Sequence, residues 1–167
     1  MLCALNLRML TLICSRVMLG ITACNLDPSA NTITFNVNAV NDAPAGTDKT
    51  ITMNEDATYS FTTADFGFSD AVEGNTLLAV KITTLASAGT LTIAAGASVP
   101  AGAVTVGQVI SAADIAFLRY TPASNANGAG YSSFTFQVQD NGGTANGGVD
   151  LDQSANTMTI DRSEERV

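Results

Sequence analysis

The sequence predicts an all-β protein, a sandwich of two packed sheets built from seven or eight short strands. Two observations predict it. Apolar and polar residues alternate along most of the chain, while helical periodicity is nearly absent. Gly, Pro, Asn and Asp residues separate the alternating segments, as turns separate strands. A chain of 167 residues is also long enough to bury a core without disulfide bonds.

The first alternating segment is residues 32–38. Ile33, Phe35 and Val37 occupy every second position there, so we expect a half-buried strand. Residues 41–46 form a joint, because Pro44 donates no backbone hydrogen bond and forces the residue before it into an extended conformation. Strand pairing should therefore end before Pro44.

Beyond the joint, the clearest strand is 133–139, in which Phe134, Phe136 and Val138 share one face. An acidic loop is expected at 64–75, and a single helical turn capped by Ser111 at 111–115. The expected strands are 49–53, 57–62, 77–83, 89–94, 104–110, 117–121, 133–139 and 155–161. So many short strands over about 115 residues fit a β-sandwich of the immunoglobulin type.

The alternation also predicts which side chains face the interior, since every second residue of a strand points to the same side. The expected core consists of Ile51, Phe61, Leu78, Val80, Ile82, Leu91, Ile93, Ile115, Leu118, Tyr120, Phe134, Phe136, Val138, Met158 and Ile160.

An internal echo indicates how the chain is organised. Residues 25–37 are NLDPSANTITFNV, and residues 150–162 are DLDQSANTMTIDR. Seven of the thirteen positions are identical, and every pair is separated by 125 residues. A fixed offset without gaps is typical of a tandem array, here with a domain-sized unit. We therefore assign 25–40 to the last strand of a preceding repeat, 47–162 to one repeat and 163–167 to a short charged tail.

Residues 1–24 differ from the rest of the chain, since they are apolar but are interrupted by Arg8 and Arg16. The uncharged runs are too short to span a bilayer. Residues 21–24 resemble a bacterial lipoprotein cleavage site with Cys24 as the lipidated residue, yet Arg16 breaks the continuous apolar stretch that a signal peptide needs. We interpret this segment as a non-native start on a gene fragment, with a weak export signal as the alternative.

The charge balance limits the possible partners. Asp and Glu number 15 against 7 Lys and Arg, for a formal net charge of −8. Phosphates would be repelled, so we expect no nucleic-acid partner, whereas crowded carboxylates attract divalent cations. The chain has no His, and its three Cys all lie within residues 1–24. Without these residues or a glycine-rich phosphate loop, we expect no enzymatic activity.

The joint and its flanks resemble a known family. VNAVNDAP at 37–44, followed by MNED at 53–56, is similar to the junction of bacterial cadherin-like tandem repeats in large surface adhesins of the RTX type. The segment 109–122, VISAADIAFLRYTP, and the strand and turn SFTFQVQD at 133–140 are similar to segments of this group and of the related proteoglycan-type repeats. The resemblance covers roughly residues 25–161 and implies an extracellular or cell-surface parent protein.

The resemblance also implies Ca²⁺ between neighbouring repeats. Asn41 and Asp42 match the central pair of the cadherin joint D-x-N-D-N-x-P, although Ala39 replaces its first Asp and Pro44 comes one residue early. Glu55 matches the acid of the first strand region, and Asp140 matches the acid that ends the penultimate strand. The loop containing Asp70, Glu73 and Asn75 loosely resembles the cadherin D-x-D-x-G-x-N loop, with altered spacing.

Elementary coordination chemistry is compatible with this ligand set. Calcium takes six to eight oxygens from carboxylates, amides, backbone carbonyls and water. Such oxygens can converge if the loops that carry them meet at one end of the sandwich. The expected ligands are Asn41, Asp42, Glu55, Asp56, Asp70, Glu73 and Asp140. Each also has a structural explanation, because Asn and Asp favour turns and charged residues solubilise loops.

These observations support a calcium-binding repeat of a surface adhesin that acts as a stiff spacer in cell adhesion, with neighbouring repeats and a cell-surface protein or glycan as partners. Three alternatives stay open. The first is that the module binds carbohydrate. This function requires an exposed aromatic platform, and the chain has no Trp to contribute to one. The second is that the module is a structural spacer that needs no ion. The third is that the reading frame is a gene fragment with no independent role.

Overall fold

The computed structural model describes residues 31–54, 56–124 and 128–163. Its contacts divide the chain into two units, Met1–Val37 and Asn38–Val167. The interpretations of residues 1–24 as a non-native start or an export signal concern a segment outside the described residues. Across the part that is described, no helix has both the length and the apolar character needed to cross a membrane.

In the first unit, residues 31–37 form no strand, and Ile33, Phe35 and Val37 are 76%, 83% and 92% exposed. The half-buried strand expected there is therefore not formed, because no described strand pairs with it. Its assignment to a preceding repeat stays a prediction.

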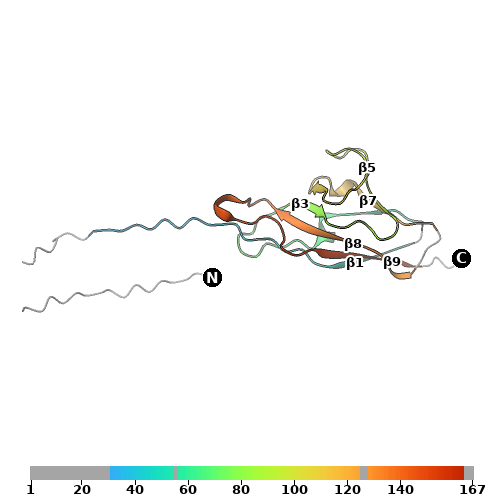
Figure 1. Ribbon diagram of the computed structural model, residues 1–167, viewed down its shortest axis with the longest axis horizontal. Helices are drawn as coiled ribbons and strands as arrows, with labels where there is room; N and C mark the ends of the chain where they lie inside the picture. Colours follow the sequence, from blue (N-terminus) through green and yellow to red (C-terminus); the bar gives the residue numbers. More distant parts are fainter. Residues whose placement is uncertain (1–30, 55, 125–127, 164–167) are drawn as a thin grey trace, which may run out of the picture. The chain divides into compact units, whose positions relative to one another are not determined.

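The second unit is an all-β sandwich of two sheets, as the alternation predicts (Figure 1). The larger sheet has the order β1-β9-β8-β3-β6, with β1 (Lys49–Asn54), β3 (Leu77–Ile82), β6 (Val109–Ser111), β8 (Gly128–Asp140) and β9 (Asn156–Ser163). The smaller sheet has the order β2-β7-β4-β5, with β2 (Tyr59–Ser60), β4 (Thr90–Ile93), β5 (Gly102–Ala103) and β7 (Leu118–Thr121). Short 3-10 helices occur at Thr63–Phe66, Ile115–Phe117 and Ala145–Gly147.

Strand directions define two ends of the sandwich. β1 runs parallel to β9, with Lys49 opposite Met158 and Asn54 opposite Ser163. β8 runs antiparallel to β9, from Gly128 opposite Arg162 towards Asp140. We call the end where β1 and β9 begin and β8 finishes the joint pole, and the other end the far pole. The loop after β8, orange-red in Figure 1, lies at the joint pole.

The interior contains every core residue that the alternation predicts except Leu78. Four rings, Phe61, Phe66, Phe134 and Phe136, pack against one another across the two sheets. Phe66 and Phe136 meet edge to face, with centroids 4.9 Å apart and planes at 87°. Met53, Phe66, Val104 and Ile110 are buried as well, although the sequence pattern does not mark them.

Leu78 is 48% exposed because β3 contains a bulge. The pairing with β8 shifts between Leu77, opposite Asp140, and Ala79, opposite Gln139. One extra residue on β3 reverses the inside–outside alternation at this point. Ala79 and Val80 are therefore buried in succession, and Leu78 faces outwards.

The prediction of one continuous strand at 104–110 is also wrong. The chain instead leaves the smaller sheet after β5 and enters the larger one at β6, through a turn closed by Gln108, whose side-chain oxygen accepts the Thr105 N–H at 2.9 Å. The helical turn expected at 111–115 forms at Ile115–Phe117 instead. Ser111 still contributes, since its Oγ accepts the Asp114 N–H at 3.2 Å.

Candidate metal site at the joint pole

Asn41, the first residue of the joint, is held at the joint pole by its side chain. Its Nδ2 donates to Asp140 Oδ1 at 3.0 Å, to Asp140 Oδ2 at 3.3 Å and to the Val149 carbonyl at 2.7 Å. Three oxygens thus surround one amide nitrogen. The sequence prediction that the joint and the end of β8 share a pole is confirmed for these two residues.

Asp140 is fully buried, and Oδ1 also accepts the Gly142 N–H at 2.8 Å. A side chain at Gly142 is excluded, because a Cβ there would overlap the amides of Asn41 and Asn75. The turn after β8 therefore leaves space for the side chain of Asn41 from the joint.

The acidic loop 70–75 packs on the same pole. Asn75 Nδ2 donates to Asn41 Oδ1 at 2.5 Å, and the Asp42 N–H donates to Glu73 Oε2 at 3.3 Å. Asp70 organises the loop, since its carboxylate accepts the N–H groups of Val72, Glu73 and Asn75. Desolvation would raise the pKa of Asp70, but these backbone donors outweigh it and lower the pKa from its ordinary value.

One of the expected ligands, Asp56, does not join this cluster. Asp56 follows the far end of β1, whose last residue Asn54 pairs with Ser163 at the far pole. β1 is six residues long, which separates its two ends by roughly 20 Å. The expectation that all the acidic loops share one pole is therefore wrong for Asp56, and Glu55 lies outside the described residues. Among those described, no group of three or more Asp, Glu, His or Cys side chains is placed to hold a metal.

A second cluster at this pole was missed by the sequence analysis. Asp152 is 4% exposed, and its Oδ2 accepts the Gly46 N–H at 2.8 Å and the Asn156 amide at 2.6 Å. Its Oδ1 accepts the N–H of Ser154 at 2.9 Å and its hydroxyl at 3.1 Å. We call Gly46, Asp152, Ser154 and Asn156 the clamp, because they tie the entry of β1 to the entry of β9.

The clamp gives the internal echo a structural meaning. Asp152, Ser154 and Asn156 are three of the seven residues repeated in segment 25–37. The identity of the echo was therefore the signal that could have revealed the clamp. Gly46 is part of the same geometry, since a Cβ there would press against the Asn156 amide.

Several buried carboxylates make the fold sensitive to acid. Burial would raise the pKa of Asp152, but the N–H groups of Ser154 and Gly46 and the Asn156 amide outweigh it and lower the pKa. The Ser98 hydroxyl and N–H, together with the Ser111 hydroxyl, lower the pKa of Asp114. An Asp side chain in the unfolded chain has a pKa of about 3.9. The stability these groups contribute is present above that pH and is lost as the pH falls through their folded pKa values.

We therefore expect the urea midpoint to change little between neutral pH and about pH 5 and to fall steeply below about pH 4. Urea unfolding followed by circular dichroism at a series of pH values measures this. The Asp152→Asn variant should show a shallower fall, because one of the titrating groups is gone. A midpoint independent of pH below 4 would contradict the role of the buried carboxylates.

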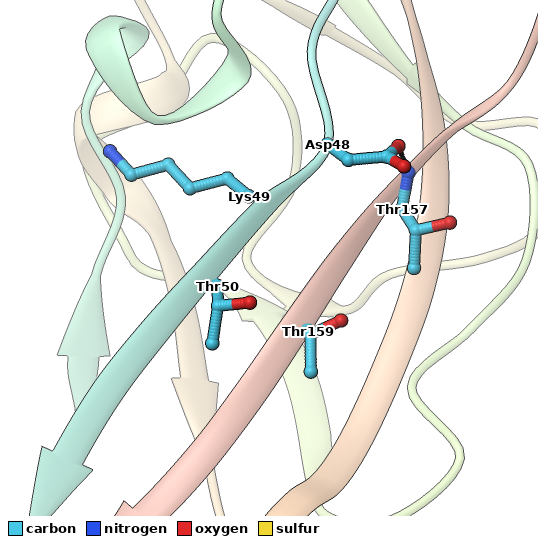
Figure 2. Close-up of a pocket in the computed structure, with 5 residues that line it drawn as sticks. All are labelled: Asp48, Lys49, Thr50, Thr157 and Thr159. Carbon is cyan, nitrogen blue, oxygen red and sulfur yellow. Dashed lines mark hydrogen bonds between the residues drawn. The ribbon is translucent and has the colours of Figure 1, made fainter.

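The outer face of β1 and β9 carries a shallow polar depression lined by Asp48, Lys49, Thr50, Thr157 and Thr159 (Figure 2). Asp48 accepts the Thr157 N–H at 2.6 Å, so it fastens the two strands together. Lys49 points away from the threonines and pairs with Asp65 at 2.6 Å. Both charged side chains of this depression, Asp48 and Lys49, therefore form contacts that stabilise the fold.

The clamp and the joint pole delimit a module that begins near Asn41. The family model for the bacterial Ig domain matches residues 41–152. The chain belongs to the bacterial Ig domain family. No significant match was found among curated proteins or among solved structures. The bacterial Ig domain is a structural module, which agrees with a β-sandwich whose buried carboxylates serve its own backbone.

Proposed function

We propose that this bacterial Ig domain is a calcium-binding, cadherin-like repeat of a bacterial surface adhesin and acts as a stiff spacer in cell adhesion. The observation that carries the proposal is the position of Asn41. The joint residue that follows a preceding repeat is tied directly to a buried carboxylate of its own module.

The arrangement of oxygens supports a cation at this pole. Both Asp140 oxygens and the Val149 carbonyl converge on Asn41 Nδ2 within 3.3 Å. The amide group supplies partial positive charge to these oxygens, and a hard cation satisfies the same oxygens more strongly. Asp42 and Glu73, both exposed beside them, offer further oxygens. One module supplies part of a calcium shell, and water completes the shell in this chain. In an array, the proposal replaces that water with ligands from the far pole of the preceding repeat, where the counterpart of Asp56 would lie.

The mechanical role follows from the charge. A chain with a formal charge of −8 places carboxylates where consecutive repeats would meet, and their repulsion would loosen an array. A divalent ion removes that repulsion and fixes the angle between repeats. A rigid array could then hold a binding partner, a cell-surface protein or a glycan, away from the cell.

The carbohydrate-binding alternative has less support. In the described part of the module, Tyr59, Phe68, Phe117 and Tyr131 pack against the core, and the remaining rings are buried within it. They form no exposed aromatic platform. The ion-independent spacer is the stronger rival, because the hydrogen bonds at the joint pole already satisfy Asp140.

Calcium should raise the melting temperature of the chain. A ligand that binds only the folded state stabilises it by about 1.4 kcal/mol at tenfold excess over Kd. This corresponds to roughly 5 °C for a module of this size. Thermal unfolding with calcium, magnesium or chelator measures the effect.

Two matched variants locate the ion. Asp140→Asn should abolish the calcium effect, whereas Asp56→Asn, the same change at the far pole, should leave it intact. Asn also tolerates the positive φ of Asp56. If calcium at millimolar concentration leaves the melting temperature unchanged, the ion-independent spacer is the correct function.

A further inference from the structure

We propose that residues 31–37 are a donor strand that takes the place of β9 in a second copy of this chain. The result is a head-to-tail oligomer held by strand exchange. This inference goes beyond the spacer function and does not depend on calcium.

The segment has the pattern of a core strand but none of its burial. Ile33, Phe35 and Val37 alternate along it and are 76%, 83% and 92% exposed. Their counterparts 125 residues later are the inward-facing residues of β9, which are 0%, 0% and 3% exposed, namely Met158, Ile160 and Arg162. Equivalent positions of the echo are thus buried in β9 and exposed in residues 31–37.

The register of β9 shows where the donor would bind. β9 lies between β1 and β8, with Met158 opposite both Lys49 and Phe134. A donor in the same register places Ile33 at the Met158 position. Its sequence also repeats the clamp residues Asp152, Ser154 and Asn156 as Asp27, Ser29 and Asn31. The donor therefore matches both the core face of β9 and the polar contacts at its start.

β9 itself contains an unfavourable buried residue near its C-terminal end. Arg162 is buried, and its Nε and Nη2 have no hydrogen-bond partner among the described residues. Its Nη1 donates to the Ala123 carbonyl at 2.9 Å, while the guanidinium lies 5.0 Å from the centre of the Tyr131 ring. A buried charge without full pairing is costly. The donor carries Val37 at this position, which removes the cost.

Chain reach excludes the same exchange within one molecule. Val37 in the Arg162 position would lie opposite Gly128, whereas Asn41 is bonded to Asp140 at the other end of β8. The two ends of this 13-residue strand are about 40 Å apart. The four residues from Val37 to Asn41 span at most about 14 Å. The acceptor must therefore be another copy, and the donor's own module then follows at the far pole of the acceptor.

Exchange requires the acceptor to release its own β9. That strand is tethered to its module, which gives it an effective concentration of the order of millimolar. It also pairs with β1 and β8 along its length. We therefore expect exchange when chains refold together at high concentration, as in other domain-swapped proteins.

The test is refolding of the full chain from urea at low and high protein concentration, followed by size-exclusion chromatography with light scattering. Oligomers should form at high concentration. Phe35→Asp should reduce them by about tenfold or more, because a carboxylate cannot enter the core. Val40→Asp is the matched control, since Val40 is exposed but lies outside the echo, and it should leave the oligomers unchanged. Arg162→Val should reduce them by improving the resident strand.

A second measurement separates strand exchange from unspecific association of the apolar start. A peptide of residues 25–38, added in excess during refolding, should occupy the β9 position, shorten the oligomers and co-elute with monomer. The same peptide with Phe35→Asp should do neither. Oligomers that persist in the Phe35→Asp chain, or a chain that stays monomeric after refolding at high concentration, would overturn the proposal.

Discussion

The Phe136→Ala variant should lose about 3–5 kcal/mol of unfolding free energy, the usual cost of removing a fully buried ring. Phe136 is 0% exposed in the centre of β8 and meets Phe66 edge to face. Truncation removes this contact and leaves a cavity between the sheets. For a module of this size the melting temperature should fall by roughly 12–20 °C. Thermal and urea unfolding measure both quantities.

Leu78→Ala is the informative control. The alternation assigns Leu78 to the core, whereas the bulge in β3 turns it outwards. We expect this change to cost only about 0.5 kcal/mol, as for an ordinary surface position. Equal losses for Leu78→Ala and Phe136→Ala would show that the bulge is not present in solution.

The Asp152→Ala variant should lose about 3 kcal/mol at neutral pH, since hydrogen bonds to a charged group contribute about 1.5–3 kcal/mol each and a buried donor left unpaired is costly. The clamp carboxylate accepts four hydrogen bonds, including those from the Gly46 N–H and the buried Asn156 amide. Its loss should open the entry of β1. Hydrogen exchange at Gly46 measures this local effect, and urea unfolding measures the total.

Gln153→Ala serves as the control beside it. Gln153 is exposed, and its side chain donates to the Leu151 carbonyl two residues away, so its loss should have little effect. The difference between Asp152→Ala and the unaltered chain should shrink below about pH 4, where the carboxylate becomes protonated. A difference that stays constant down to pH 2 would mean that the carboxylate charge is not what holds the clamp.

Predictions of the strands succeeded where local pattern and burial agree. In β8, Phe134, Phe136 and Val138 alternate without interruption, and the structure buries all three. Prediction failed where the chain changes sheets or changes register. The turn between β5 and β6 and the bulge at Leu78 are both set by pairing with distant strands, which periodicity in one segment does not encode.

The candidate site shows the same division. Residue types and the joint motif predicted that Asn41 and Asp140 would lie together, and they do. Asp56 was grouped with them because MNED at 53–56 resembles the acidic turn that follows the joint in cadherin-like repeats. The parallel pairing of β1 with β9 carries it to the far pole. Phe66 was missed because it lies in a short 3-10 helix, where no strand alternation marks it, although it becomes part of the core.

The sequence by itself determined that this chain is an all-β sandwich, that its body is acidic and that the sequence of its last strand is echoed at an offset of 125 residues. These properties follow from local side-chain periodicity, charge and identity. Only the tertiary structure decided which acidic groups share a pole, that Asp152 is the buried carboxylate of the clamp and that two nitrogens of the buried Arg162 have no partner among the described residues. These depend on strand direction and register, which arise from contacts between residues about a hundred positions apart, such as Gly46 with Asp152.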